Sequence, residues 1–391
     1  MNAGEISKAP RARSAHGAPV ASQLLERLIA RIRTHGPITF SAYMDACLYD
    51  PEFGYYSGAI ERGRADYYTS VDVSPIFGRL LARQFEEMWR IAGKPKTFTM
   101  VEAGAGTGRL AAHILDFASL RLSEFYSSLH YAAVEVSESR RRMLQAALAR
   151  HIAADRASSL GELPPSVACG CVFSNELLDA LPVHRVVMTA NGLREIFIDT
   201  GSERLIEREL SPSSLEIPEY FKRQGIVLEP GQQAEAGLAA CRWIKDVARR
   251  VARGFVLTID YGHEARELYD QRHADGTLLA YSRHRASEEF YRAPGEQDLT
   301  AHVNFTALDI WGREVGLERL GFTSQTNFLL GIARATDFTD LQNDEWSEME
   351  KTRARLSFQN LVNPEGMGET FRVMVQGKGI GSPKLMGLAD L

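Results

Sequence analysis

The sequence places three glycines within five residues, at Gly104, Gly106 and Gly108, directly after the apolar stretch TFTMVEA. A glycine inside a regular element costs roughly 0.5–1 kcal/mol relative to alanine, so such a cluster indicates a left-handed turn, a ligand close to the main chain, or both. Residues 108–117 then follow a helical pattern. The sequence therefore predicts a strand, a glycine-rich turn and a helix in succession.

Strand and helix patterns alternate along the chain after Gly93. Further strands are expected in HYAAVEVS, ACGCVFSN and RGFVLTIDYG, with helices between them. This alternation predicts an α/β fold with a doubly wound, Rossmann-like parallel sheet, whose ligands bind outside the carboxyl ends of the strands. Two closing strands are expected in FTSQTNFLLGI and FRVMVQGKG.

The chain has 391 residues, more than the roughly 250–300 at which a single core stops growing, so insertions or a second domain are expected. Asn191 and Gly192, between two apolar runs, predict a hairpin. The expected parts are a flexible tail at 1–18, an N-terminal helical lid segment at 19–95, a discontinuous core at 96–185 and 236–391 with an irregular excursion at 263–305, and a β-rich insertion at 186–235.

Charge and cysteine content exclude several classes of protein. The formal net charge is −5, which gives no general attraction for nucleic acid. The four cysteines are scattered, and the spacing of histidines and cysteines matches no zinc motif. We therefore expect reduced thiols, no metal and no nucleic-acid partner.

The first 18 residues contain Arg, Ser and Ala in the manner of a transit peptide, but they carry an early glutamate and lack an apolar core. Nor does any apolar run approach the roughly 18 residues that a membrane span needs. We therefore expect a tail on a cytoplasmic protein without a membrane span.

The glycine turn fits one nucleoside cofactor better than others. A dinucleotide fingerprint needs a third glycine where this chain has Arg109, and no phosphate loop ending in GK[ST] is present. The pattern that remains, E-x-G-x-G-x-G beginning at Glu102, is typical of enzymes that use S-adenosylmethionine. Glu135 ends the next strand, where a carboxylate can accept hydrogen bonds from both ribose hydroxyls. The alternative is a structural glycine turn with a surface glutamate.

Polar side chains also follow the later strand in FSNELLDALP. Asn175, Glu176 and Asp179 are expected above the sheet, near a transferable methyl group, although a helix cap with a first-turn carboxylate is an alternative. Asp260 ends another strand at the same edge, either as a site residue or as part of a turn. His302 could accept a proton through solvent, or could be a packed core residue.

Six segments in this order resemble the MidA family of class I methyltransferases. They are PITFSAYMDACLYDPEFGYYSG, DYYTSVDVSPIFGRLLARQF, VEAGAGTGRL, VFSNELLDALPVHRV, TIDYG and DLTAHVNF. The family is linked to respiratory complex I assembly in mitochondria and to protein arginine methylation. The chain departs from the family at residues 65–72, where Gly-Asp-Phe and Thr-Ser-Pro-Glu are usual.

The resemblance implies an S-adenosylmethionine-dependent methyltransferase that acts on a protein, with a complex I subunit as one acceptor. A guanidinium stays protonated, with a pKa above about 12, so a carboxylate must hold it and take its proton. Glu176 is expected in that role, with Asn175 orienting backbone or substrate and Asp179 in support. A catalytically silent assembly factor and a nicotinamide oxidoreductase are the alternatives, and the oligomeric state is left open, a homodimer included.

Overall fold

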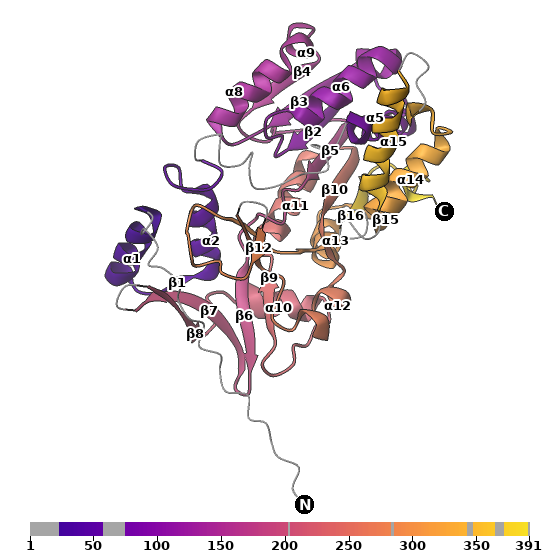
Figure 1. The fold of residues 1–391 in the computed structure, drawn as a ribbon. Helices are drawn as coiled ribbons and strands as arrows, with labels where there is room; N and C mark the ends of the chain where they lie inside the picture. The colour runs from indigo at the N-terminus through magenta and orange to yellow at the C-terminus, as the bar shows by residue number, and fades with distance from the viewer. Residues whose placement is uncertain are drawn as a thin grey trace, which may run out of the picture.

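The computed structural model describes residues 23–57, 75–201, 204–282, 285–341, 347–363 and 371–389. Figure 1 shows two regions, a large sheet covered by helices and a smaller β-rich region beside α1 and α2. The tail at 1–18 and the departure at 65–72 lie outside the described residues.

A mixed eight-stranded sheet forms the centre of the larger region. Its order is β15-β16-β10-β5-β2-β3-β4, with β14 paired to β10. The strands β10, β5, β2, β3 and β4 are parallel, and β15 and β16 add antiparallel pairs at one edge. The expected α/β sheet is confirmed. The strands are β2 (Phe98–Ala103), β3 (Leu129–Val134), β4 (Ala157–Leu160), β5 (Gly170–Asn175), β10 (Gly254–His263), β14 (Val303–Asn304), β15 (Glu318–Ser324) and β16 (Phe371–Lys378).

Helices cover both faces of this sheet because successive strand residues point to opposite sides. In β2, Met100 belongs to the core under α5 and α6, whereas Val101 belongs to the core under α11 and α13. These helices and their neighbours are α5 (Pro75–Ile91), α6 (Arg109–Arg121), α7 (Ser123–Ser128), α8 (Glu138–Ala147), α9 (Ala149–Ala153), α11 (Leu238–Arg250), α13 (Phe305–Arg313), α14 (Gln325–Ala335) and α15 (Glu348–Val362).

A second, antiparallel sheet joins the N-terminal segment to the insertion. The short strand β1 pairs with β7, so the two segments share one sheet although they are far apart in the sequence. The expected hairpin is present, because Thr189 of β6 pairs with Gly192 of β7. The elements are α1 (Gln23–His35), β1 (Ile38–Thr39), α2 (Phe40–Tyr49), β6 (His184–Thr189), β7 (Gly192–Thr200), β8 (Leu205–Leu210), α10 (Glu216–Arg223) and β9 (Gln233–Ala236).

The excursion at 263–305 is more regular than its composition predicts. It contains a three-stranded antiparallel sheet, ordered β12-β11-β13, whose buried side chains share a core with α1 and α2. The elements are α12 (Ala265–Leu268), η1 (Gln271–His273), β11 (Leu279–Ser282), β12 (Arg285–Ser287) and β13 (Asp298–Thr300).

One of the two expected closing strands is wrong over most of its length. β15 ends at Ser324, and the remainder of FTSQTNFLLGI forms α14. Ser324 caps this helix, since its side chain accepts a hydrogen bond from the N–H of Asn327. Phe328, Leu329 and Ile332 then bury one face of the helix in the core.

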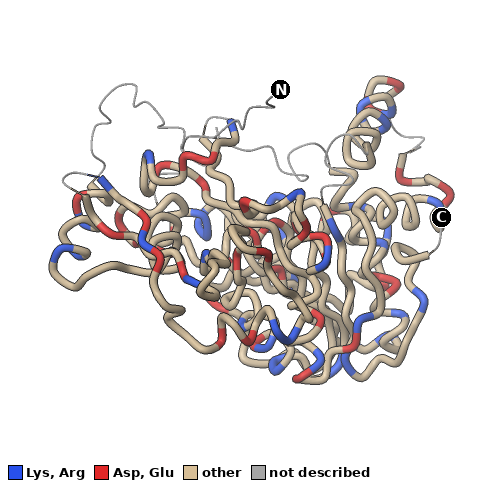
Figure 2. The backbone as a smooth tube through the Cα atoms, turned by 90° about the horizontal axis from the view of Figure 1, so that it is seen from below, with Lys and Arg blue, Asp and Glu red and all other residues tan. Residues whose placement is uncertain are grey.

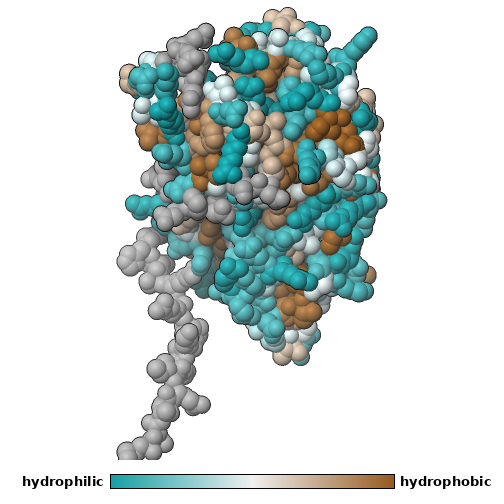
Figure 3. All heavy atoms as spheres, turned by 90° about the vertical axis from the view of Figure 1, so that its right-hand side faces the viewer, coloured by the Kyte–Doolittle hydropathy of each residue, from teal (hydrophilic) through white to brown (hydrophobic). Residues whose placement is uncertain are grey.

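Charged residues of both signs are interspersed over the backbone (Figure 2). On the face in Figure 3, hydrophobic groups are interrupted by hydrophilic ones. Among the described residues, no helix is both long and apolar enough to cross a bilayer. All four cysteines are free thiols, as expected.

Candidate cofactor and catalytic site

The glycine turn joins β2 to α6, and each of its glycines has a left-handed backbone. The φ angles are 76° at Gly104, 55° at Gly106 and 81° at Gly108. A Cβ at Gly108 would lie 2.5 Å from Cδ1 of Leu144, so this glycine lets α6 approach α8. A Cβ at Gly106 would meet nothing within 4 Å. Gly106 therefore faces open space, where a ligand could lie against the main chain.

The carboxylate of Glu135 closes one side of this turn. Glu135 follows β3 and is buried. Its Oε2 accepts a hydrogen bond from the backbone N–H of Gly106 at 3.0 Å, and its Oε1 accepts one from Ser137 at 2.8 Å. A carboxylate offers about four lone-pair positions, so acceptor capacity remains for ligand hydroxyls.

Glu102 lies at the end of β2 and is buried beside Glu135. Its Oε2 accepts a hydrogen bond from the hydroxyl of Tyr131 at 2.7 Å. Burial raises the pKa of Glu102 to about 8; the Tyr131 hydrogen bond opposes this rise, and the charge of Glu135 adds to it. At neutral pH the carboxyl is therefore mostly protonated and can donate as well as accept a hydrogen bond.

The segment after β5 turns sharply at Glu176. Its φ of 53° is left-handed, a conformation that costs a residue with a side chain roughly 1–2 kcal/mol. The amide nitrogen of Asn175 donates to Oε1 of Glu176 at 3.0 Å. The amide oxygen of Asn175 is buried without a hydrogen-bond partner. A strained backbone at Glu176, next to the unsatisfied amide oxygen of Asn175, is typical of a site that binds a ligand.

Asp260 holds this turn from the neighbouring strand. Its Oδ2 accepts hydrogen bonds from the backbone N–H groups of Leu177 and Leu178, at 3.1 and 2.8 Å. Its Oδ1 accepts one from the N–H of Tyr261 at 2.9 Å. Burial raises the pKa of Asp260 to about 7, and these backbone bonds oppose the rise. Asp260 therefore fixes the backbone that carries Glu176.

Asp179 lies in a group of carboxylates above the sheet. Burial raises its pKa well above the ordinary value, and the charges of Asp260, Asp298 and Glu176 raise it further. Asp298 was not singled out from the sequence. It comes from β13, and it accepts a hydrogen bond from the hydroxyl of Tyr56 at 2.8 Å. Four acidic residues from three segments therefore form one cluster of carboxyl groups.

Two tyrosines from the N-terminal segment lie against this acidic cluster. The hydroxyl of Tyr49 donates to the carbonyl of Ala180 at 3.0 Å, and the rings of Tyr49 and Tyr56 stack with centroids 5.6 Å apart. Tyr55 and Tyr56 belong to the segment at 19–95, from which the sequence predicts a lid. The other tyrosine pair of that segment, at 67–68, lies outside the described residues.

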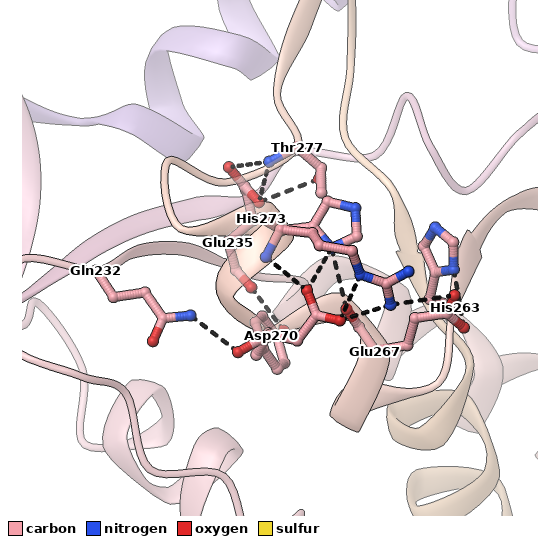
Figure 4. A network of polar contacts seen from close by, with 9 residues as sticks. Gln232, Glu235, His263, Glu267, Asp270, His273 and Thr277 are labelled. Atoms are coloured by element: carbon pink, nitrogen blue, oxygen red, sulfur yellow. Dashed lines mark hydrogen bonds and ion pairs between the residues drawn. The ribbon is translucent and has the colours of Figure 1, made fainter.

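His302 lies beside two other histidines. Its ring centroid is 5.3 Å from that of His263 and 6.1 Å from that of His273. Burial lowers the pKa of His302 to about 4, and the two neighbouring rings lower it further. An imidazole with so low a pKa is a weak base for the proton-accepting role expected from the sequence. Figure 4 shows His263 and His273 within a polar network.

The residues present fit the nucleoside of S-adenosylmethionine. Open space at Gly106 admits the ligand to the main chain, and the carboxylate of Glu135 lies beside it. The acidic cluster follows β5, which is adjacent to β2 in the sheet. Both features therefore lie at the carboxyl edge of the parallel strands, where such sheets bind ligands.

Comparison with known proteins decides the family. Residues 80–323 match the family described as "Putative S-adenosyl-L-methionine-dependent methyltransferase". The chain belongs to this family. Its cofactor is S-adenosylmethionine, and it is an enzyme of the methyltransferase class, as the sequence predicted.

Two solved structures from Burkholderia thailandensis share the fold over nearly the whole chain. One is bound to S-adenosyl-homocysteine, is 31% identical, has a TM-score of 0.84, and is matched over 95% of this chain and 97% of its own. The other, a native structure, is 32% identical with a TM-score of 0.82, over 95% and 98% of the two chains. They confirm the class I methyltransferase fold.

Curated relatives include the protein arginine methyltransferase NDUFAF7, mitochondrial, from Rattus norvegicus and from Danio rerio. Each is 30% identical; the matches cover 89% and 92% of this chain, and 83% and 88% of the relatives. The names of these relatives place them in mitochondria. This finding contradicts our expectation of a cytoplasmic protein, which rested on the early glutamate in the tail and on its lack of an apolar core.

Proposed function

We propose that this methyltransferase acts on the guanidinium group of an arginine in a protein. The observation that carries the proposal is the acidic cluster of Glu176, Asp179, Asp260 and Asp298, in which like charges already act on one another. A delocalised cation with five donors satisfies several carboxylates at once. The names of the curated relatives support the same acceptor.

Glu176 is the residue best placed to bind the acceptor. Its strained backbone projects the carboxylate from the end of β5, and Asn175 fixes one of its two oxygens. The unsatisfied amide oxygen of Asn175 can accept a hydrogen bond from a second guanidinium nitrogen. S-adenosylmethionine, when bound, supplies a methyl group on a positively charged sulfur.

Residues of this chain then orient the guanidinium group and accept the proton that it loses. The carboxylate of Glu176 holds one guanidinium nitrogen and takes the proton that this nitrogen loses as it gains the methyl group. Asp179 adds a second carboxyl group near Glu176, and Asp260 keeps the turn in place. Orientation of this kind can contribute several kcal/mol to the rate acceleration, so little further machinery is needed.

The test uses the full chain, S-adenosylmethionine with a deuterated methyl group, and a protein extract from cells that lack the gene. Mass spectrometry should find the label on arginine side chains. Glu176→Gln should bind the cofactor normally but transfer the methyl group at least a hundredfold more slowly. Glu209→Gln, an exposed position on β8, is the control.

Label on lysine, on nucleic acid or on small metabolites would contradict the arginine proposal. Calorimetric binding of the cofactor without any transfer would favour the silent assembly factor instead. The complex I subunit expected from the resemblance remains a prediction, and the labelled proteins in the same experiment would identify the acceptor.

A further inference from the structure

Three histidines from separate segments, His263, His273 and His302, meet beside the end of β10. His263 is the last residue of that strand, His273 ends the η1 turn, and His302 lies between β13 and β14. One nitrogen from each ring lies within 4.8 Å of the other two. Within the part of the chain that the structure describes, this group has the composition and proximity of a metal site.

An oxygen atom lies next to Nδ1 in two of the rings and favours a proton on that nitrogen. The lone pair is then left on the other ring nitrogen, Nε2. Nδ1 of His273 lies 3.0 Å from the carbonyl oxygen of Glu267, and only a protonated Nδ1 can donate to a carbonyl. Nδ1 of His263 lies 3.2 Å from a carboxylate oxygen of the same residue, close enough for an ion pair but without the geometry of a hydrogen bond. In metal sites, a histidine ligand is usually oriented by such a carbonyl or carboxylate on its other nitrogen. Figure 4 shows Glu267 and Asp270 beside the two rings.

The third ring, that of His302, has one nitrogen without a hydrogen-bond partner, and the backbone of this residue is held in place. The Nδ1 atom of His302 is buried and has no hydrogen-bond partner. The backbone N–H of His302 donates to the hydroxyl of Thr277 at 3.0 Å, and the same hydroxyl donates to buried Glu235 at 3.1 Å. The segment before β14 is thereby fixed to β9.

We propose that His263, His273 and His302 bind one divalent transition-metal ion, zinc being the best match, with water at the fourth position. Three imidazole ligands are typical of zinc, whereas calcium and magnesium prefer oxygen. Ligand nitrogens around tetrahedral zinc lie about 3.4 Å apart, given bonds of about 2.0–2.1 Å. The ligand nitrogens, which now lie within 4.8 Å of one another, must therefore draw together by up to about 1.4 Å.

Such an ion would connect the excursion to the carboxyl edge of the sheet. His263 lies three residues after Asp260, which holds the Glu176 turn. The N–H of Ala301, next to His302, donates to the carbonyl of Asp179 at 2.9 Å. We therefore infer that the ion fixes β10 and the β13–β14 link around the acidic cluster.

The experiment uses the full chain without a polyhistidine tag, stripped with EDTA and then titrated with Zn²⁺ or Co²⁺. We expect one equivalent of either ion, visible absorption from four-coordinate Co²⁺, and a melting temperature raised by several degrees with Zn²⁺. His302→Gln and His273→Gln should each bind at least tenfold more weakly. His35→Gln, at the end of α1 away from the cluster, should bind as the wild type does.

Circular dichroism of each variant separates loss of binding from loss of folding. If His302→Gln does not fold, the test is made with His273→Gln, because His273 lies on a short turn. The proposal is overturned if the stripped wild type takes up no stoichiometric ion, or if folded His273→Gln and wild type bind Zn²⁺ with equal affinity. Neither readout depends on methyl transfer, so failure of the arginine proposal would leave this one standing.

Discussion

The carboxylate of Glu135 accepts a hydrogen bond from the backbone N–H of Gly106 at 3.0 Å. This contact joins the end of β3 to the glycine turn after β2. A second carboxylate oxygen of Glu135 accepts the N–H of Ser137, just before α8. Glu135 therefore organises the turn as well as offering acceptors to a ligand.

Glu135→Gln should weaken S-adenosylmethionine binding by about 10- to 100-fold, because hydrogen bonds to a charged group contribute about 1.5–3 kcal/mol. The NH₂ group of the glutamine would also face a backbone N–H, so that two donors would meet where the carboxylate now accepts a hydrogen bond. Isothermal calorimetry measures the change. Glu138→Gln, an exposed position on α8, is the matched control, and equal affinities for the two variants would refute the assignment.

Gly106→Ala should weaken cofactor binding while leaving the fold intact. Both Gly106 and Gly36 have positive φ and open space around a Cβ, so alanine at either position carries similar backbone strain, about 1 kcal/mol. Only at Gly106 does the new methyl group enter the proposed cofactor site. Binding in Gly106→Ala should fall at least tenfold, and Gly36→Ala should bind normally. If the two variants bound alike, the cofactor would not lie against this turn.

The sequence predicted the parts of the site that depend on local pattern. The glycine turn, Glu135 and Glu176 follow apolar strands, and Glu102 and Asn175 lie at the ends of theirs. Parallel strands bring their carboxyl ends to one edge. The β15–α14 junction was missed because an apolar run alone does not distinguish a strand from a helix. Here the capping side chain of Ser324 decides the matter.

Contacts between distant segments could not be predicted from a single sequence. Asp298 joins the acidic cluster because the excursion folds into a small sheet over α2, and its composition gives no sign of that. The three histidines likewise meet only because β14 pairs with β10. Motif spacing detects metal ligands on one local segment, and these ligands come from three.

The stability of the ligand-free protein should depend on pH through Glu102. Its pKa is about 8 when folded and 4.5 in the reference state, so between these values the folded chain holds a proton that the unfolded chain has lost. The free energy of unfolding should therefore fall as pH rises from about 4.5 to about 8, by on the order of a few kcal/mol.

Glu102→Gln removes this titration while keeping an acceptor for Tyr131. Urea unfolding from pH 5 to pH 8 should show the variant gaining stability relative to wild type as pH rises. Glu124→Gln, an exposed carboxylate on α7, should follow the wild-type slope. Parallel curves for wild type and Glu102→Gln would show that burial of Glu102 does not carry the pH dependence.

Glu176→Gly should separate stability from activity. The left-handed backbone at Glu176 costs about 1 kcal/mol that glycine avoids, so the variant should unfold at the same or a higher denaturant concentration than wild type. Glu176→Gln keeps the strain and loses the charge, which makes it the matched comparison. Both variants should bind S-adenosylmethionine and fail to transfer its methyl group, and the glycine variant should be the more stable. A glycine variant less stable than the glutamine variant would show that the turn is not strained and that Glu176 stabilises it through its side chain.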